Sequence, residues 1–129
     1  MSEVQFDVPS SILDSLPSED DGAVADMEQA VAGWEQRINQ GIEAADSTQE
    51  IGEVLVDSID IMESRLERYD AFVPELRAWG QSPIHAIAWR NLYAHLIQQI
   101  ADNDQYADLI DRERNARLVE DGIRWENIE

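Results

Sequence analysis

The chain of 129 residues contains no cysteine, which excludes disulfide bonds, thiolate zinc sites and cysteine nucleophiles. No apolar run approaches the roughly 20 residues that span a bilayer, so no membrane segment is expected. The first residues, MSEVQFDVPSS, lack the basic-then-apolar pattern of a secretion signal. We therefore expect a protein that does not contact a membrane and is not secreted by a signal peptide.

Lysine is also absent, because all nine basic residues are arginine, against 28 acidic residues and a formal charge of −19. This acidic excess without lysine is similar to the usual composition of proteins from salt-loving microbes. At molar salt the Debye length falls to about 3 Å, which screens the repulsion among the carboxylates. The carboxylates then keep the surface hydrated where salt favours aggregation. The composition predicts a halophilic protein, and an ordinary acidic protein is the alternative.

No part of the chain is basic. The N-terminal 46 residues are the most acidic, and the rest also carries more acids than arginines. Sequence-independent binding of nucleic acid needs Lys and Arg to neutralise phosphates. We therefore expect no direct binding of DNA or RNA.

The first 18 residues show no clear helical period and contain Pro9 and Pro17. They nevertheless carry more large apolar side chains than a disordered tail would. We expect residues 1–18 to form an extended arm that docks on its own chain or on a neighbouring subunit. A single helical domain, residues 19–129, is expected to follow. The apolar residues of the arm are Val4, Phe6, Val8, Ile12, Leu13 and Leu16.

Apolar residues recur at three- and four-residue spacing through the rest of the chain, and no segment alternates as a strand does. The spacing predicts a helix over about 20–45. The capping box STQE at residues 47–50 then opens a second helix that reaches about Phe72. Gly33 and Gly41 weaken the first helix, and either can permit close helix contact. The short turn between the two helices is typical of an antiparallel hairpin.

Two further helices are expected beyond Pro74, which ends the second helix or begins a single turn through Trp79. They run over about 82–101 and 104–121, and Gly122 is expected to cap the last one. The predicted fold is all-α, with an antiparallel hairpin of two long helices, two further helices and the extended N-terminal arm.

The predicted helix over 82–101 contains no acidic residue, and Arg90 is its one formal charge. A helix that is apolar nearly all round is buried. This helix is either the central helix of the core, or one of its apolar stripes forms an interface with another subunit or a partner. Aromatic residues and arginine are common interface anchors. The candidate interface residues of the whole chain are Phe6, Ile12, Leu13, Leu16, Trp89, Arg90, Tyr93, Ile97 and Trp125.

The last predicted helix carries acid-before-arginine pairs four residues apart, such as Asp108–Arg112 and Glu113–Arg117. These pairs predict a solvated face opposite three apolar residues, Leu109, Ile110 and Leu118. A hydrated surface is also the simplest interpretation of the acidic stripe on the second helix, which consists of Glu53, Asp57, Asp60, Glu63 and Glu67.

Two acidic pairs on the second helix, Glu50-x-x-Glu53 and Glu67-x-x-Asp70, resemble the paired motifs of the all-helical nucleotide pyrophosphatases of the MazG type. The resemblance covers these four residues and implies magnesium-dependent hydrolysis, because carboxylates bind that hard cation. In that family the motifs face each other from separate helices. Here the helical stripe between them is unbroken, which places them on one helix, roughly 25 Å apart.

The two histidines do not form a metal pair, because His85 and His95 lie about 80° apart around a helix. The chain has no glycine-rich phosphate loop and no arrangement typical of a serine nucleophile. We therefore expect no catalytic residue, no cofactor and no metal ion.

These observations favour a non-enzymatic structural or adaptor subunit of a larger assembly from a halophile or its virus. The expected location is the cytoplasm of a high-salt organism, or a virion. We expect protein partners, in a homo-oligomer or a multi-subunit complex. The most concrete expectation is a head–tail neck component of a tailed virus, by analogy with other small helical proteins that carry arms. The alternatives are a helical regulatory or antitoxin-like protein of the host cell and, more weakly, the pyrophosphatase.

Overall fold

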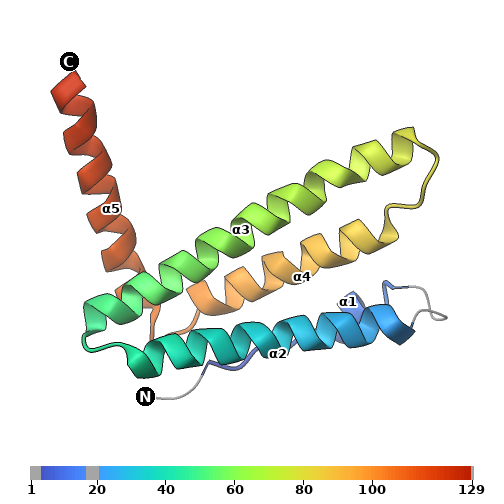
Figure 1. Ribbon diagram of the computed structural model, residues 1–129, viewed down its shortest axis with the longest axis horizontal. Coiled ribbons are helices and arrows are strands. Elements are labelled where there is room, and N and C mark those ends of the chain that lie inside the picture. The colour runs from blue at the N-terminus through green and yellow to red at the C-terminus, as the bar shows by residue number, and fades with distance from the viewer. Residues whose placement is uncertain (1–3, 17–20, 129) are drawn as a thin grey trace.

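A computed structural model describes the backbone of residues 4–16 and 21–128 and the side chains of residues 4–16 and 22–120 (Figure 1). Every regular element of these residues is an α-helix, which confirms the predicted all-α class. The helices are α1 (Ser10–Leu13), α2 (Asp21–Ala44), α3 (Thr48–Ala78), α4 (Ile84–Ala101) and α5 (Ala107–Ile128). No helix in these ranges is long and apolar enough to cross a membrane.

The start of α3 is fixed by the predicted cap. Ser47 accepts a hydrogen bond at its side-chain oxygen from the Glu50 N–H at 3.2 Å. The Glu50 carboxylate in turn accepts from the N–H of Asp46, one residue before the cap, at 2.6 Å. The first bond satisfies a backbone donor that a helix start leaves unpaired, and the second ties the turn before the cap to the first turn of α3. They separate α3 from α2 within three residues of turn.

Pro74 does not end α3, contrary to expectation, and lies inside the helix. Proline loses one backbone hydrogen bond there, but α3 packs on α4, its most extensive helix–helix contact. The helix ends instead at Ala78, and Gly80 follows the C-cap residue Trp79 with a φ of +73° that suits glycine. The Gln81 N–H then donates to the Leu76 carbonyl at 2.8 Å, the bond that defines a Schellman motif.

Gly122 does not end α5 either, because the helix continues to Ile128. A glycine inside a helix costs only about 1 kcal/mol relative to alanine. That cost does not end a helix by itself, so the sequence signal was too weak for the predicted boundary.

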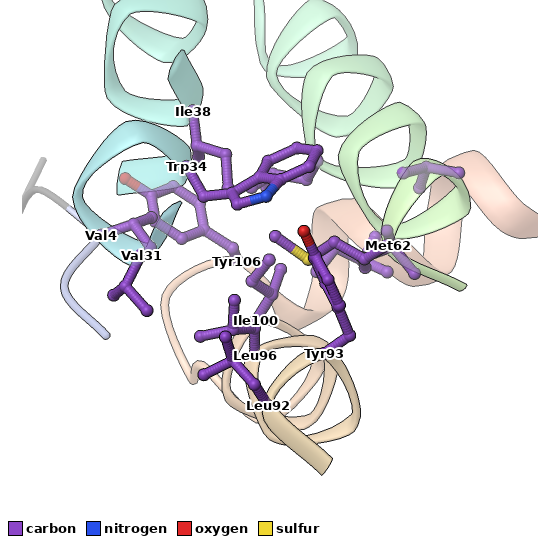
Figure 2. Close-up of a cluster of buried hydrophobic side chains, with 14 of the residues drawn as sticks. Val4, Val31, Trp34, Ile38, Met62, Leu92, Tyr93, Leu96, Ile100 and Tyr106 are labelled. Carbon is purple, nitrogen blue, oxygen red and sulfur yellow. The ribbon is translucent and has the colours of Figure 1, made fainter. Parts of the chain in front are cut away.

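The other long helices, α2, α4 and α5, all pack on α3. In the view of Figure 1, α4 lies between α3 and α2. The contact of α3 with α4 is more extensive than its contact with α2, the expected hairpin partner. The α4 side chains that face inward are buried in the core of their own chain (Figure 2). They are Ala86, Ala88, Leu92, Tyr93, Leu96 and Ile100.

Candidate protein-docking site

The backbone of the arm is held by four polar side chains, here called the arm site: Glu35 and Asn39 of α2, and His95 and Gln99 of α4. The Val4 N–H donates to Asn39 Oδ1 at 2.7 Å, and Asn39 Nδ2 donates to the Val4 carbonyl at 3.0 Å. The Phe6 N–H donates to Glu35 Oε1 at 2.8 Å. Because these bonds use peptide groups of the arm, they do not depend on its side chains.

Gln99 repeats the paired contact at Asp7. The Asp7 N–H donates to Gln99 Oε1 at 2.9 Å, and Gln99 Nε2 donates to the Asp7 carbonyl at 2.6 Å. His95 Nε2 lies 3.0 Å from the same carbonyl. Since a carbonyl oxygen only accepts, His95 Nε2 carries the hydrogen in this contact. The arm therefore bridges α2 and α4 through hydrogen bonds to both helices.

Side chains of the arm alternate between the core and solvent. Val4 is 3% exposed, and Phe6 and Val8 pack half-buried against the core. Gln5 and Asp7 point to solvent. This period of two matches that of a strand, and one face of the segment 4–8 contacts the core.

The remaining arm residues also face their own chain. Ile12 and Leu16 are buried in the core cluster, and Leu13 packs against it half-buried. The short helix α1, which the sequence did not predict, contacts α4. The structure thus places the arm candidates Phe6, Ile12, Leu13 and Leu16 in the packing of a single chain.

The α4 candidates also join α4 to the rest of the chain. Tyr93 is buried, and Trp89 stacks half-buried on Tyr69 of α3, with 6.0 Å between ring centroids. Arg90 forms an ion pair with Asp70 at 3.0 Å. Burial raises the pKa of the Tyr69 hydroxyl, and the neighbouring Tyr93 raises it by a smaller amount. Of the other two candidates, Ile97 is half-buried and the side chain of Trp125 lies outside the described residues.

The tip, defined here as residues 72–84, consists of the end of α3, the turn at 79–83 and the first residue of α4. It exposes three large apolar side chains. The exposed fractions are 75% for Trp79, 42% for Phe72 and 41% for Ile84. No acidic residue occurs between Leu76 and Ala101, although the chain has 28 acids. Sequence reasoning did not select these side chains. The available signal was that the acid-free stretch begins before α4.

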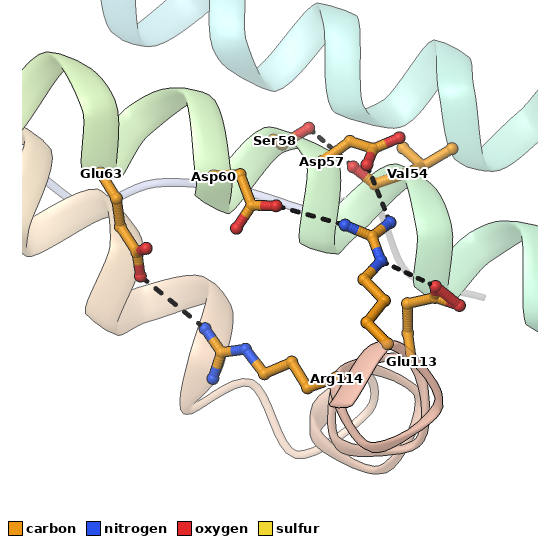
Figure 3. A network of polar contacts seen from close by, with 8 residues as sticks. Val54, Asp57, Ser58, Asp60, Glu63, Glu113 and Arg114 are labelled. Atoms are coloured by element: carbon orange, nitrogen blue, oxygen red, sulfur yellow. Dashed lines mark hydrogen bonds and ion pairs between the residues drawn. The ribbon is translucent and has the colours of Figure 1, made fainter. Parts of the chain in front are cut away.

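The first half of α5 packs on the acidic face of α3 through Arg117. Its guanidinium lies 2.8 Å from Asp57, 3.2 Å from Asp60 and 3.0 Å from Glu113 (Figure 3). The hydrogen bond to Asp57 raises the pKa of the Arg117 guanidinium above its ordinary value. The acidic stripe was expected to be only a hydrated surface, and this part of it instead binds α5. The helix α5 then leaves the body (Figure 1).

The apolar residues of α5 divide along its length. Ile110 is 1% exposed, and Leu109 packs half-buried against the core. Leu118 does not point inward as expected but is 66% exposed, and its neighbour Val119 is 61% exposed. Leu118 lies beside Val56 and Asp60 of α3, which cover only part of its side chain. The expected pairs Asp108–Arg112 and Glu113–Arg117 both form, at 3.9 Å and 3.0 Å.

The two acidic pairs of the pyrophosphatase resemblance all lie on α3. Glu50 caps that helix, and Asp70 pairs with Arg90. Within the described part of the chain, no three His, Asp or Glu side chains converge to hold a metal ion. The geometry gives Glu50 and Asp70 structural contacts and does not bring the two pairs together.

Residues 1–127 match a family of unknown function, DUF7971, and the chain belongs to that family. The match includes both the arm and α5. No curated protein and no solved structure matches the chain.

Proposed function

We propose that this protein is a non-enzymatic structural or adaptor subunit of a larger protein assembly, in a halophile or its virus. A head–tail neck component of a tailed virus is the concrete form of this proposal. The subunit binds protein through its tip and makes no direct contact with nucleic acid or membrane.

The observation that carries the proposal is the exposure of Trp79. An indole that is 75% exposed leaves a large apolar surface in water, and tryptophan is enriched among residues that dominate binding energy. Two copies with a charge of −19 repel each other. That repulsion is reduced at the tip, because its one acid, Glu75, is balanced by Arg77, and the chain has no acid from Leu76 to Ala101. We therefore infer that another copy binds there.

The exposed part of α5 supports an adaptor in particular. Leu118 and Val119 lie on the half of α5 that points away from the body. The tip lies at the opposite end of α3 (Figure 1). Two apolar surfaces at two ends let one subunit contact two neighbours, and such head-to-tail contacts generate rings or filaments.

Light scattering in molar KCl tests the role of the tip with a matched pair of variants. Trp79→Ser is expected to lower the measured mass, because fewer copies of the chain associate when the tip contact is lost. Gln81→Ala, at an exposed position of the same turn, is expected to leave it unchanged. Equal masses for wild type and Trp79→Ser at all concentrations would contradict the proposed tip contact. A wild type that is a stable monomer would favour the helical regulator instead.

A further inference from the structure

A stripe of exposed side chains runs along the second half of α3 into the tip. Its members are three or four residues apart, the spacing at which a helix presents one side to a neighbouring helix. All of them are exposed, whereas Val73, on another side of α3, is buried. This line, here called the α3 stripe, consists of Arg65, Arg68, Phe72, Glu75 and Trp79. It joins the exposed aromatic rings of the tip to two arginines.

The two arginines of the α3 stripe, Arg65 and Arg68, form no ion pair with any carboxylate of the described residues, although the chain has 28 acids. Arg65 is held by aromatic rings instead. Its Cζ atom lies 5.2 Å from the Trp34 ring centroid, and its Nη1 donates to the Tyr93 hydroxyl at 3.1 Å. A guanidinium has five N–H donors, so Arg65 keeps donors for a carboxylate. With Glu75 as its one acid, the α3 stripe is basic and apolar in a strongly acidic chain.

The acids on the adjacent line of α3 are already engaged in part. Glu63 lies 4.0 Å from Arg114, and Asp70 lies 3.0 Å from Arg90. These pairs reduce the negative charge beside the α3 stripe, and they leave the charges of its own arginines uncompensated.

The outer half of α5, residues 118–128, has the complementary composition. It combines five apolar residues with three acids and one arginine, and its first two residues, Leu118 and Val119, are exposed. Two α3 stripes in contact would bring arginines together, and two outer halves would bring acids together. Opposite charges meet only when an α3 stripe contacts an outer half, so charge favours this pairing over the two symmetric ones.

We propose that the α3 stripe is the docking site for the outer half of α5 of a second copy. This inference rests on the proposed function, since it requires copies to meet. The apolar residues of the outer half cover Phe72 and Trp79, and its acids face Arg65 and Arg68. Because the contact uses different surfaces of the two copies, it is head-to-tail and generates a ring or a filament.

The outer half of α5 cannot cover the tip of its own chain. Leu118 lies beside Val56 of α3, and a helical rise of 1.5 Å per residue places Phe72 roughly 24 Å further along α3. By the same rise the outer half is roughly 15 Å long. It also points away from the body, at the end of α3 opposite the tip (Figure 1). Contact between the tip and the outer half is therefore contact between copies.

Disulfide trapping between full-length chains tests the pairing. The chain has no cysteine, so Glu75→Cys marks the α3 stripe and Val119→Cys marks the outer half of α5, both at exposed positions. Each variant is oxidised in molar KCl, alone and in an equimolar mixture, and the covalent dimers are identified by their masses under denaturing conditions. In the control mixture Gln105→Cys, exposed in the turn before α5, replaces Val119→Cys.

The pairing predicts that the mixed dimer of Glu75→Cys with Val119→Cys forms several-fold more than either dimer of like chains and several-fold more than the control dimer. Adding Arg68→Glu to the chain that carries Glu75→Cys should lower the mixed dimer about tenfold, because repulsion replaces attraction. Arg112→Glu makes the same charge change at another exposed position and should leave the yield unchanged.

A mixed dimer that is no more frequent than the control dimer would overturn the pairing. Dimers of like chains that equal the mixed dimer in yield would overturn it as well, and so would equal effects of Arg68→Glu and Arg112→Glu.

Light scattering of the wild-type chain separates this inference from the proposed function. An oligomer without an excess of mixed dimers overturns the pairing and leaves the assembly proposal standing. A monomer in molar KCl overturns both.

Discussion

The Gln99 side chain binds both backbone groups of Asp7: it accepts from the N–H at 2.9 Å and donates to the carbonyl at 2.6 Å. The two residues are far apart in the sequence, and their contact closes the N-terminal arm onto α4. With Asn39 on α2, Gln99 holds the backbone of the arm without a partner strand.

Gln99→Ala removes this paired contact and should lower the unfolding free energy by about 1 kcal/mol, the typical net value of a hydrogen bond. Gln98→Ala is the matched control, because Gln98 is the exposed neighbour on the same helix. Its effect should stay within about 0.5 kcal/mol. Denaturant titration in molar KCl measures both. Equal effects of the two variants would contradict a specific role for Gln99.

Gly52 allows α5 to approach α3. A Cβ atom there would lie 2.9 Å from the Leu109 carbonyl oxygen, a backbone atom that cannot rotate away. Gly52→Ala should therefore destabilise the chain by about 1–3 kcal/mol, as overpacking does. Gly33→Ala meets nothing within 4 Å and should stabilise α2 by up to about 1 kcal/mol. Thermal unfolding of the two variants should show shifts of opposite sign, and shifts of the same sign would contradict the account.

Arg117 is the main ionic contact between α5 and α3. Arg117→Gln should lower the unfolding free energy by up to about 1 kcal/mol, since the guanidinium is partly exposed. Arg112→Gln changes the net charge equally, but its pair with Asp108 is long and exposed. That control should cost about 0.3 kcal/mol or less. The difference should shrink as KCl is raised, and a difference independent of salt would argue against an ionic contribution.

Burial raises the pKa of Tyr69 from its ordinary value of 10.0, because the folded chain disfavours the phenolate. The folded state thus holds this proton more tightly than the unfolded state. The contribution of Tyr69 to stability is complete below about pH 10 and is lost as the pH rises through the raised pKa. Tyr69→Phe should therefore show a shallower loss of stability above pH 10. Denaturant titrations at several alkaline pH values measure the slope, and identical slopes would contradict this assignment.

The spacing of apolar residues predicted the all-α class and the ranges of α2 and α4 closely, because helix burial follows directly from that period. It failed at Pro74 and Gly122, where single residues with a local cost were taken as helix ends. Packing of α3 on α4 provides stability that no local rule includes. The contact between α3 and α4 also exceeds that of the expected hairpin, since loop length does not measure side-chain packing.

The candidate docking residues were less predictable. Apolar character selected Ile12, Leu16 and Tyr93, yet all three are buried within the chain. It passed over Trp79, whose exposure depends on its position at the turn into α4. Asn39 and Gln99 could not be found either, because a polar side chain that binds a distant backbone leaves no periodic signal. Leu118 shows the same limit, since its exposure follows from the direction of α5.

The mass of the wild-type chain in molar KCl, measured by sedimentation over a range of concentrations, tests the central claim most directly. The account predicts a folded assembly of several copies, stabilised as salt screens the charge of −19. A single 14.7 kDa species at every concentration, equally well folded in dilute buffer, would contradict it.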